Sequence, residues 1–255
     1  MRRWEIGQAQ SIGGRTEQQD QSAAFVLDDA RTCLMVVADG MGGRPGGAEA
    51  AKAVIDCARA IMQRSVDANA LEGAPLLNDI ALSAHETIRA ITDDPDTGPR
   101  ATITAYFAHG NEGHWVSVGD SRLYRFSGHQ LVERTKDQSL VQLLVDMGKI
   151  SEDEAADHPD RNIITGSLGG HDRPKLGTGQ ATARHGDSIV LCTDGLWGAV
   201  DPQEMVDAAM ADDIGAGAVG LVSTAAARAG EEADNVTLLM GRIKRKDKAW
   251  PWAKG

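Results

Sequence analysis

Cysteine, long apolar runs and basic charge are all scarce in this sequence, and each scarcity removes a class of protein. Cys33, Cys57 and Cys192 are the three cysteines in 255 residues, and no two of them form a Cys-x-x-Cys pair. Their odd number and wide spacing argue against a disulfide framework or a zinc knuckle and indicate a reducing compartment. No run approaches the roughly 20 apolar residues of a membrane span, and the N-terminus lacks the apolar stretch of a signal peptide. The sequence therefore predicts a soluble, cytoplasmic protein.

Basic residues are outnumbered by acidic ones. The chain has 26 Lys and Arg against 37 Asp and Glu, a formal net charge of −11. A protein that binds nucleic acid needs a concentrated basic surface for the phosphates, so we expect no nucleic-acid partner. With 42% hydrophobic residues the composition is that of an ordinary globular protein. We expect a monomer with one domain over residues 1–243 and a basic, flexible tail over residues 244–255.

Short apolar segments between turn-forming residues predict strands, and apolar residues at three- and four-residue spacing predict helices. The predicted strands are residues 24–27, 33–38, 101–107, 115–118, 188–192 and 236–240, with a hairpin of 122–126 and 130–134. The predicted helices are residues 48–64, 75–91, 140–147, 203–210 and 216–229, with a short helix that opens on a capping box at Ser151 to Glu154. Strands and helices come in blocks without regular alternation, which favours an α+β layered sandwich.

Three of the predicted strands run directly into an aspartate beside a glycine. The segments are CLMVVADG, HWVSVGD and SIVLCTDG, which end near Asp39, Asp120 and Asp194. If these strands are neighbours, their tips bring the three carboxylates together at one edge of the sandwich. Asp20 and Asp234 are candidates for the same edge. A single Asp-Gly after a strand is usually only a turn, so the repetition is what indicates a site.

Such a cluster needs a cation, because like charges this close raise one another's pKa. Oxygen ligands without flanking histidines favour Mg²⁺ or Mn²⁺ over zinc. Two such ions would offset most of the charge and lower the pKa of a bound water, which would generate a hydroxide nucleophile near neutral pH. The expected cofactors are therefore two ions of Mn²⁺ or Mg²⁺, with room for a third.

Six motifs in order resemble those of the metal-dependent protein phosphatases of type 2C, and the resemblance is closest to the bacterial members. The motifs are RTEQQD from Arg15, DGMGG from Asp39, GDSRLY from Gly119, HPDRNIITGSLG from His158, TDGLW from Thr193 and the pair Asp234-Asn235. They span nearly the whole chain. The resemblance implies a four-layer α-β-β-α sandwich of two mainly antiparallel sheets with the active site at one edge.

The same resemblance implies a role for each candidate residue. Asp39 would bridge two metals, and the backbone carbonyl of Gly40 would bind one of them. Asp194 and Asp234 would complete the shell of the first ion. Asp20 would hold metal-bound water, and Asp120 would contact a third ion. Arg15 would bind the phosphate, for which a guanidinium fork is well suited.

The chain also departs from the family pattern. Gln18 stands in place of an asparagine, and Gln19 stands where many members have glutamate. Met41 and Arg44 occupy positions where relatives offer a histidine as proton donor, and Arg100 replaces a glycine. None of these changes removes an expected metal ligand, but the proton donor has no assigned residue.

The implied activity is hydrolysis of phosphoserine and phosphothreonine in proteins by a hydroxide that two metals activate, without a phosphoenzyme. The expected partners are phosphorylated protein substrates and a cognate Ser/Thr kinase pathway. No cysteine has an arginine six positions later, which excludes a cysteine-nucleophile phosphatase. A non-catalytic pseudophosphatase that binds phosphopeptides is the alternative, and an enzyme dedicated to one regulator is a third reading.

Overall fold

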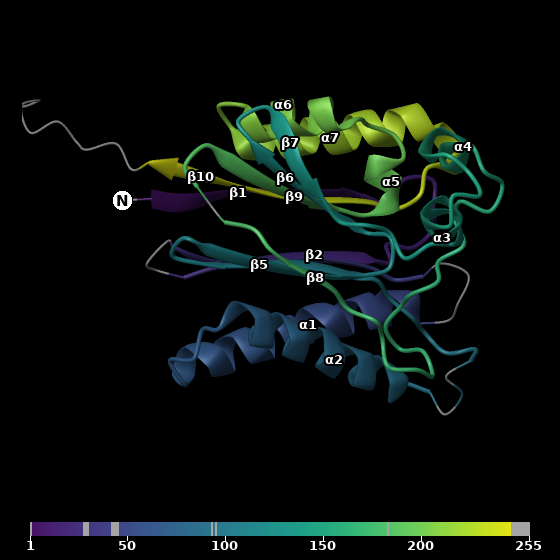
Figure 1. Ribbon diagram of the computed structural model, residues 1–255, viewed down its shortest axis with the longest axis horizontal. Coiled ribbons are helices and arrows are strands. Elements are labelled where there is room, and N and C mark those ends of the chain that lie inside the picture. Colours follow the sequence, from purple (N-terminus) through teal and green to yellow (C-terminus); the bar gives the residue numbers. More distant parts are fainter. Residues whose placement is uncertain are drawn as a thin grey trace, which may run out of the picture.

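A computed structural model describes residues 2–27, 31–41, 46–92, 94, 96–182 and 184–245. Within these residues, two five-stranded antiparallel sheets lie face to face between two layers of helices (Figure 1). This arrangement confirms the four-layer sandwich that the sequence predicted. Among the described residues, no helix combines the length and the apolar character needed to cross a membrane.

The sheet drawn uppermost in Figure 1, here the upper sheet, has the strand order β1-β10-β9-β6-β7, and the lower sheet has the order β2-β3-β4-β5-β8. The upper strands are β1 Arg2–Ser11, β6 Arg122–Ser127, β7 Gln130–Arg134, β9 Asp187–Cys192 and β10 Val236–Arg245. The lower strands are β2 Asp20–Val26, β3 Thr32–Asp39, β4 Ile103–His109, β5 Glu112–Val118 and β8 Gly177–Gln180.

Strand β3 shows why the layers stack as they do. Successive side chains of a strand point to opposite faces of the sheet, and nearly all of β3 is apolar. Leu34 and Val36 pack toward the helices, whereas Met35 and Val37 pack between the two sheets. The continuous run of apolar residues is therefore explained by burial on both faces.

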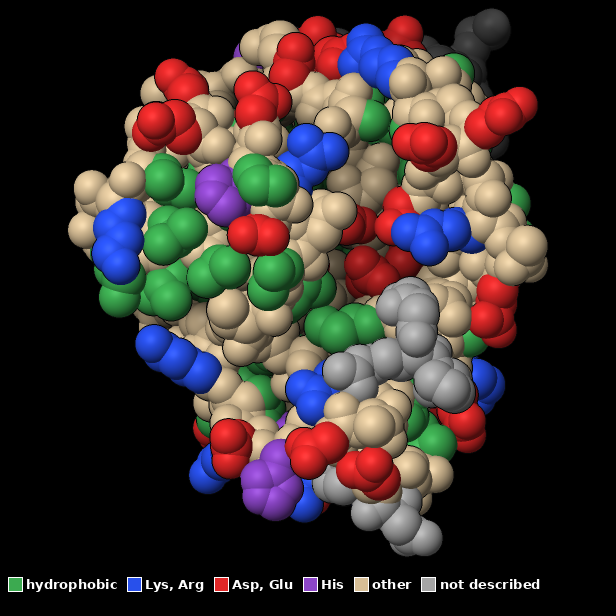
Figure 2. Space-filling view, turned by 90° about the vertical axis from the view of Figure 1, so that its right-hand side faces the viewer, with side chains coloured by type: hydrophobic (Ala, Val, Ile, Leu, Met, Phe, Trp, Pro, Cys, Tyr) green, Lys and Arg blue, Asp and Glu red, His purple; other side chains and the backbone are tan. Residues whose placement is uncertain are grey.

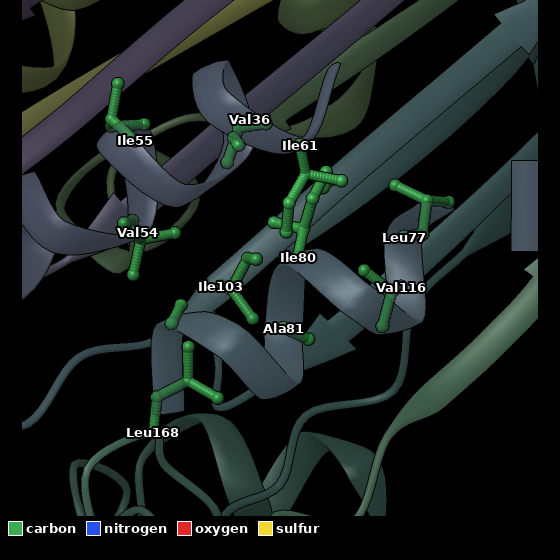
Figure 3. Close-up of a cluster of buried hydrophobic side chains, with 14 of the residues drawn as sticks. Val36, Val54, Ile55, Ile61, Leu77, Ile80, Ala81, Ile103, Val116 and Leu168 are labelled. Atoms are coloured by element: carbon green, nitrogen blue, oxygen red, sulfur yellow. The ribbon is translucent and has the colours of Figure 1, made fainter. Parts of the chain in front are cut away.

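Two helices cover each outer face of the sandwich. Helices α1 Gly47–Asp67 and α2 Gly73–Arg89 lie under the lower sheet, and α6 Pro202–Met210 and α7 Ile214–Ala229 lie over the upper sheet (Figure 1). The apolar stripe predicted on α1 is buried, and Val54 and Ile61 join Ile80 of α2 against Ile103 and Val116 of the sheet (Figure 3).

The remaining short helices are α3 Leu140–Asp146, α4 Glu152–Ala156, α5 Asp194–Trp197 and the 3₁₀ turn Gly230–Glu232. Helices α3, α4 and α5 gather at one end of the sandwich (Figure 1). The capping box predicted at the start of α4 is present, because Ser151 accepts a hydrogen bond from the Glu154 amide and Glu154 accepts one from the Ser151 amide. These helices mark the edge where the candidate site lies.

Strands β1 and β8 were not predicted. Strand β1 has few β-branched residues, and its place is fixed by a ten-residue antiparallel register with β10. Strand β8 reads GTGQ, and its Gly179 leaves room for the ring of Trp115. Strand β10 continues to Arg245, so the predicted domain boundary at residue 243 falls inside a strand, and residues 246–255 of the expected tail lie outside the described residues.

Candidate active site

The structure places all five predicted aspartates at the edge of the sandwich marked by α5. Asp20 begins β2, Asp39 ends β3, and the two are paired in the antiparallel register. Asp120 follows β5 by two residues, Asp194 begins α5 two residues after the end of β9, and Asp234 precedes β10 by two residues. Both sheets therefore contribute carboxylates to one place, as the strand-end pattern predicted.

Asp20 and Asp39 are held by hydroxyl groups from distant parts of the chain. Thr193 donates its Oγ1 hydrogen to Oδ2 of the buried Asp20 at 2.8 Å. The same Thr193 oxygen accepts the amide of Thr237 at 3.0 Å, which ties it to β10. Thr102 accepts the amide of Asp39 through its Oγ1 at 3.0 Å. Thr193 thus fixes Asp20, the first residue of β2, and Thr102 fixes Asp39, the last residue of β3.

Burial and repulsion by neighbouring carboxylates raise the pKa of Asp20, Asp39 and Asp194. Burial, and then the charges of Asp194 and Asp234, raise the pKa of Asp20 to about 7. Burial, with the charge of Asp234, raises the pKa of Asp194 to about 6, although Arg15 opposes the shift. The pKa of Asp39 is raised well above its usual value by burial and by four neighbouring aspartates. The site in this form is short of positive charge.

Asp120 is buried like Asp20 and lacks a hydrogen-bond partner for one oxygen. Its side chain is buried, and Oδ1 makes no hydrogen bond. Burial, together with the charges of Asp194 and Asp137, raises the pKa of Asp120 to about 8. A buried carboxylate oxygen without a donor is costly unless a cation or a proton satisfies it.

A cation–aromatic stack supports the turn that carries Asp120. The indole of Trp197 donates to the Asp120 carbonyl at 3.0 Å, and the guanidinium of Arg122 lies 3.5 Å from the centre of that ring. Arg122 also donates two hydrogen bonds to Asp137, at 2.8 and 2.7 Å. Asp137 precedes α3, so this network links the carboxylate edge to the segment that leads into α3.

Arg15 and Asp234 form an ion pair at the rim. The Arg15 Nη2 atom lies 2.7 Å from Oδ2 of Asp234, and the two side chains are 51% and 42% exposed. Such an exposed pair is weak. An incoming phosphate can therefore compete with Asp234 for the guanidinium at little cost.

Asn235 belongs to the last sequence motif, but the sequence reasoning gave it no role in the site. Its side-chain Nδ2 donates to the backbone carbonyls of Ile12 and Glu17, at 2.9 and 3.0 Å, and its side-chain Oδ1 accepts the backbone amide of Gln19 at 2.8 Å. Three hydrogen bonds from one buried side chain thus position the loop that carries Arg15. Its place directly after Asp234 was the available signal.

Gly40 lies where two backbone segments meet. A Cβ atom at this position would come within 2.1 Å of the Gly47 carbonyl oxygen and 2.7 Å of the Gln19 carbonyl oxygen. The Gly40 amide donates to that Gln19 oxygen at 3.1 Å. A side chain is therefore excluded at Gly40. Gly42 and Gly43 of the same motif, and Arg44 directly after it, lie outside the described residues.

These residues surround a cleft of about 630 Å³ whose lining is mostly polar. Its lining residues are Arg15, Thr16, Glu17, Gln19, Asp39, Gly40, Met41, Arg100, Asn162, Ile164, Ser167, Asp194, Asp234 and Asn235. Figure 2 shows the hollow, with acidic side chains recessed at its bottom and basic side chains near its rim. The sequence reasoning had not assigned Asn162, Ile164 or Ser167 to the site.

The donor set fits divalent cations of the hard type. Partly exposed Asp39, Asp194 and Asp234 line the cleft, and oxygen donors of this kind suit Mg²⁺ and Mn²⁺. The raised pKa values and the unsatisfied Asp120 oxygen both reflect missing positive charge. In the described part of the chain, no three acidic, His or Cys side chains are gathered closely enough to form a ready metal site.

Comparison with known proteins shows the family. Residues 8–217 match the family model described as Protein phosphatase 2C. The chain therefore belongs to the protein phosphatase 2C family.

Individual relatives agree with this assignment. The chain is 33% identical over 213 residues to the serine/threonine protein phosphatase PstP of Mycobacterium tuberculosis, and the match covers 82% of this chain. It spans only 40% of the length of that relative.

Two solved structures share the fold. The serine/threonine phosphatase of S. agalactiae superposes with a TM-score of 0.79 at 26% identity, over 94% of this chain and 100% of that one. The catalytic domain of PstP in complex with two manganese ions superposes with a TM-score of 0.77 at 30% identity, over 96% of this chain and 100% of that one.

Proposed function

We propose that this chain is a metal-dependent protein phosphatase that hydrolyses phosphoserine and phosphothreonine. The observation that carries the proposal is the cleft in which Asp39, Asp194 and Asp234 form an acidic floor while Arg15 stands at the rim. Membership of the protein phosphatase 2C family supports the same reaction.

The proposal assigns two core ions to the acidic floor. Asp39, Asp194, Asp234 and the carbonyl of Gly40 would hold them, with Asp20 placed behind these groups and Asp120 available to a third ion. The manganese ions of the PstP catalytic domain support this assignment. When bound, Mn²⁺ or Mg²⁺ supplies activated water and offsets the charge of the phosphate.

The protein's own groups bind and orient the substrate. Arg15 would exchange its weak contact with Asp234 for a bidentate contact with the phosphate. Thr193 and Thr102 keep Asp20 and Asp39 in place, and Asn235 keeps the Arg15 loop in place. Positioned charge of this kind usually gives the largest share of catalysis in phosphoryl transfer.

We further propose that no phosphoenzyme forms. Cys33 and Cys192 are buried inside strands, and burial raises the pKa of both thiols, so neither is an available nucleophile. A rapid acid quench of the reaction with a ³²P-labelled phosphopeptide should leave no label on the protein. Labelled protein would contradict direct hydrolysis.

The wider setting is inferred from the sequence. The proposal includes a cytoplasmic monomer that acts on proteins phosphorylated by a Ser/Thr kinase of the same cell. The alternative is a phosphopeptide-binding module of the same fold without catalysis.

One experiment separates these functions. Hydrolysis of p-nitrophenyl phosphate and of a phosphothreonine peptide should require Mn²⁺ or Mg²⁺ and stop after EDTA. Activity that survives chelation would refute the metal assignment. Tight binding of the phosphopeptide without hydrolysis under any metal would favour the binding module.

A further inference from the structure

A second groove opens beside the catalytic cleft. Its volume is about 560 Å³, and it is lined by residues from the loop before β4, from the start of α3 and from the segment before β8. Arg100 and Ser167 line both the cleft and this second groove, and the Arg100 Nη1 atom lies 3.5 Å from the Ser167 hydroxyl. A peptide with its phosphorylated residue in the cleft can therefore continue into the groove.

Two acidic side chains of the groove form ion pairs with basic residues that do not line it. Asp137 is paired with Arg122 at 2.7 Å, and both side chains are largely buried. Asp146 is paired with Lys136 at 2.9 Å. These carboxylates therefore add little negative charge to the groove.

The basic side chains of the groove outnumber the acids that are left. Arg173 and Lys175 line it against Asp172, while Arg100 and Asp96 add one basic and one acidic group that offset each other in this count. Arg173 and Lys175 are exposed, and neither forms an ion pair with any described residue. In a chain with a net charge of −11, an excess of basic groups next to the site is a local exception.

The backbone around these basic groups is held in place. Gln138 donates to the carbonyl of Lys175 at 2.8 Å and to no acid of the groove. A Cβ atom at Gly170 would lie 3.1 Å from Nη1 of Arg100, so the glycine leaves space for the guanidinium. Gln138 thus ties the backbone of Lys175 to the segment before α3.

We propose that the second groove binds an acidic side chain of the phosphoprotein substrate, with Arg100 at the junction and Arg173 and Lys175 along the groove. This inference rests on the proposed function. Guanidinium groups are suited to carboxylates because they donate in parallel pairs. The acidic floor of the cleft repels an acidic peptide, so a separate basic groove lets such a substrate bind in one orientation.

The test uses a set of phosphothreonine peptides in which one position at a time, on either side of the phosphothreonine, carries Glu. Each is compared with the matching peptide that carries Gln at that position. For Glu at positions on one side only, kcat/KM should rise about two- to fivefold over the Gln peptide, the range given by exposed ion pairs. The preference should shrink at high salt. Equal rates for every Glu and Gln pair would overturn the inference, and so would a preference that does not depend on position.

Charge reversal identifies the residues responsible. The double variant Arg173→Glu with Lys175→Glu should abolish or invert the preference for Glu, and Arg173→Gln with Lys175→Gln should abolish it with a smaller risk to folding. Arg64→Glu makes the same kind of charge change on an exposed face of α1 and should keep the preference. A preference that persists in both double variants would refute the groove.

Two further arms separate the remaining outcomes. A peptide with phosphoserine at the preferred position shows whether the groove takes a second phosphate; preference for that peptide alone would overturn the carboxylate assignment. Hydrolysis of p-nitrophenyl phosphate by the unaltered protein tests the proposed function itself. Failure there removes both proposals, whereas equal peptide rates with intact hydrolysis remove only the groove.

Discussion

The cluster between the lower sheet and helices α1 and α2, here the helix-side core, contrasts with the aspartate edge. Both regions exclude much of the solvent, and both are built around β3. The helix-side core contains apolar side chains such as Val36, Val54 and Ile80. The aspartate edge holds carboxyl groups that raise one another's pKa. Residues of a single strand therefore serve stability along its length and a site at its end.

The difference shows how the fold accommodates an unfavourable site. Burying a fully satisfied apolar cluster stabilises the sandwich at about 25 cal/mol per Å² of apolar area. Burying like charges costs free energy unless cations arrive. The helix-side core must offset that cost in the metal-free protein, so changes in the two regions should have opposite signatures.

Asp39→Asn should produce the largest effect on activity. The change removes the carboxylate expected to bridge both ions, and we expect kcat to fall by roughly a thousandfold, at the upper end of losses for a single electrostatic group. Because it also removes repulsion, the melting temperature in EDTA should be unchanged or higher. Asp79→Asn on the exposed face of α2 is the control. Near-normal turnover by Asp39→Asn would remove Asp39 from the site.

Ile80→Ala should show the reverse signature. Ile80 is fully buried in the helix-side core, and such truncations cost about 2–5 kcal/mol of unfolding free energy. Urea unfolding should show this loss, while kcat/KM of the folded fraction stays the same. Val219→Ala, at a position 57% exposed on α7, should change the free energy little. A loss of kcat/KM without a loss of stability would contradict the separation of the two regions.

The stability of the metal-free protein should depend on pH through the aspartate edge. Asp20 and Asp120 have folded pKa values raised to about 7 and about 8, so the folded chain holds protons that the unfolded chain has released. This contribution is fully present below about pH 4 and is lost as the pH rises through about 8, so the unfolding free energy measured in EDTA should fall by several kcal/mol over that range.

Two measurements check that pH dependence. Asp120→Asn should flatten the decrease in unfolding free energy between low and high pH, because it removes one of the groups that titrate. Mn²⁺ should stabilise the protein more at about pH 8 than at about pH 5, since binding requires ionised carboxylates. Equal stabilisation at both values would argue against these aspartates as ligands.

Arg15→Ala should have the smallest effect of the series. Loss of one guanidinium contact should raise KM for a phosphopeptide about three- to tenfold and lower kcat less. Arg15→Lys keeps the charge without the fork and should give an intermediate KM. An unchanged KM for Arg15→Ala would mean that the phosphate is bound elsewhere.

Much of the contrast between the two regions could be predicted from sequence. The apolar stripe of α1 and the run of β3 identify the helix-side core by periodicity alone. The strand-end aspartates identify the edge because the last residue of a buried strand lies at the edge of the sandwich. Helix and strand limits were off by a few residues, as at α2, where the predicted 75–91 is Gly73–Arg89.

The supporting polar residues could not be predicted, for a physical reason. Thr193, Thr102 and Asn235 bind groups that are far away along the chain, since their bonds to Asp20, Asp39 and Ile12 span 173, 63 and 223 positions. Neither residue type nor spacing reveals such a partner before the sheets are assembled. Strands β1 and β8 were not predicted for a related reason. Their extended conformation depends on pairing with adjacent strands more than on their own residue types.

The place of β10 between β1 and β9 affects how the protein is made. Translation produces β1 first and β10 last among the strands, yet these two strands are hydrogen-bonded along ten residues. Until β10 emerges, β1 has no neighbour in its sheet, and the Arg15 loop lacks the three contacts of Asn235. A nascent or truncated chain that ends before β10 therefore lacks an assembled site, so synthesis itself delays activity until this last strand is in place.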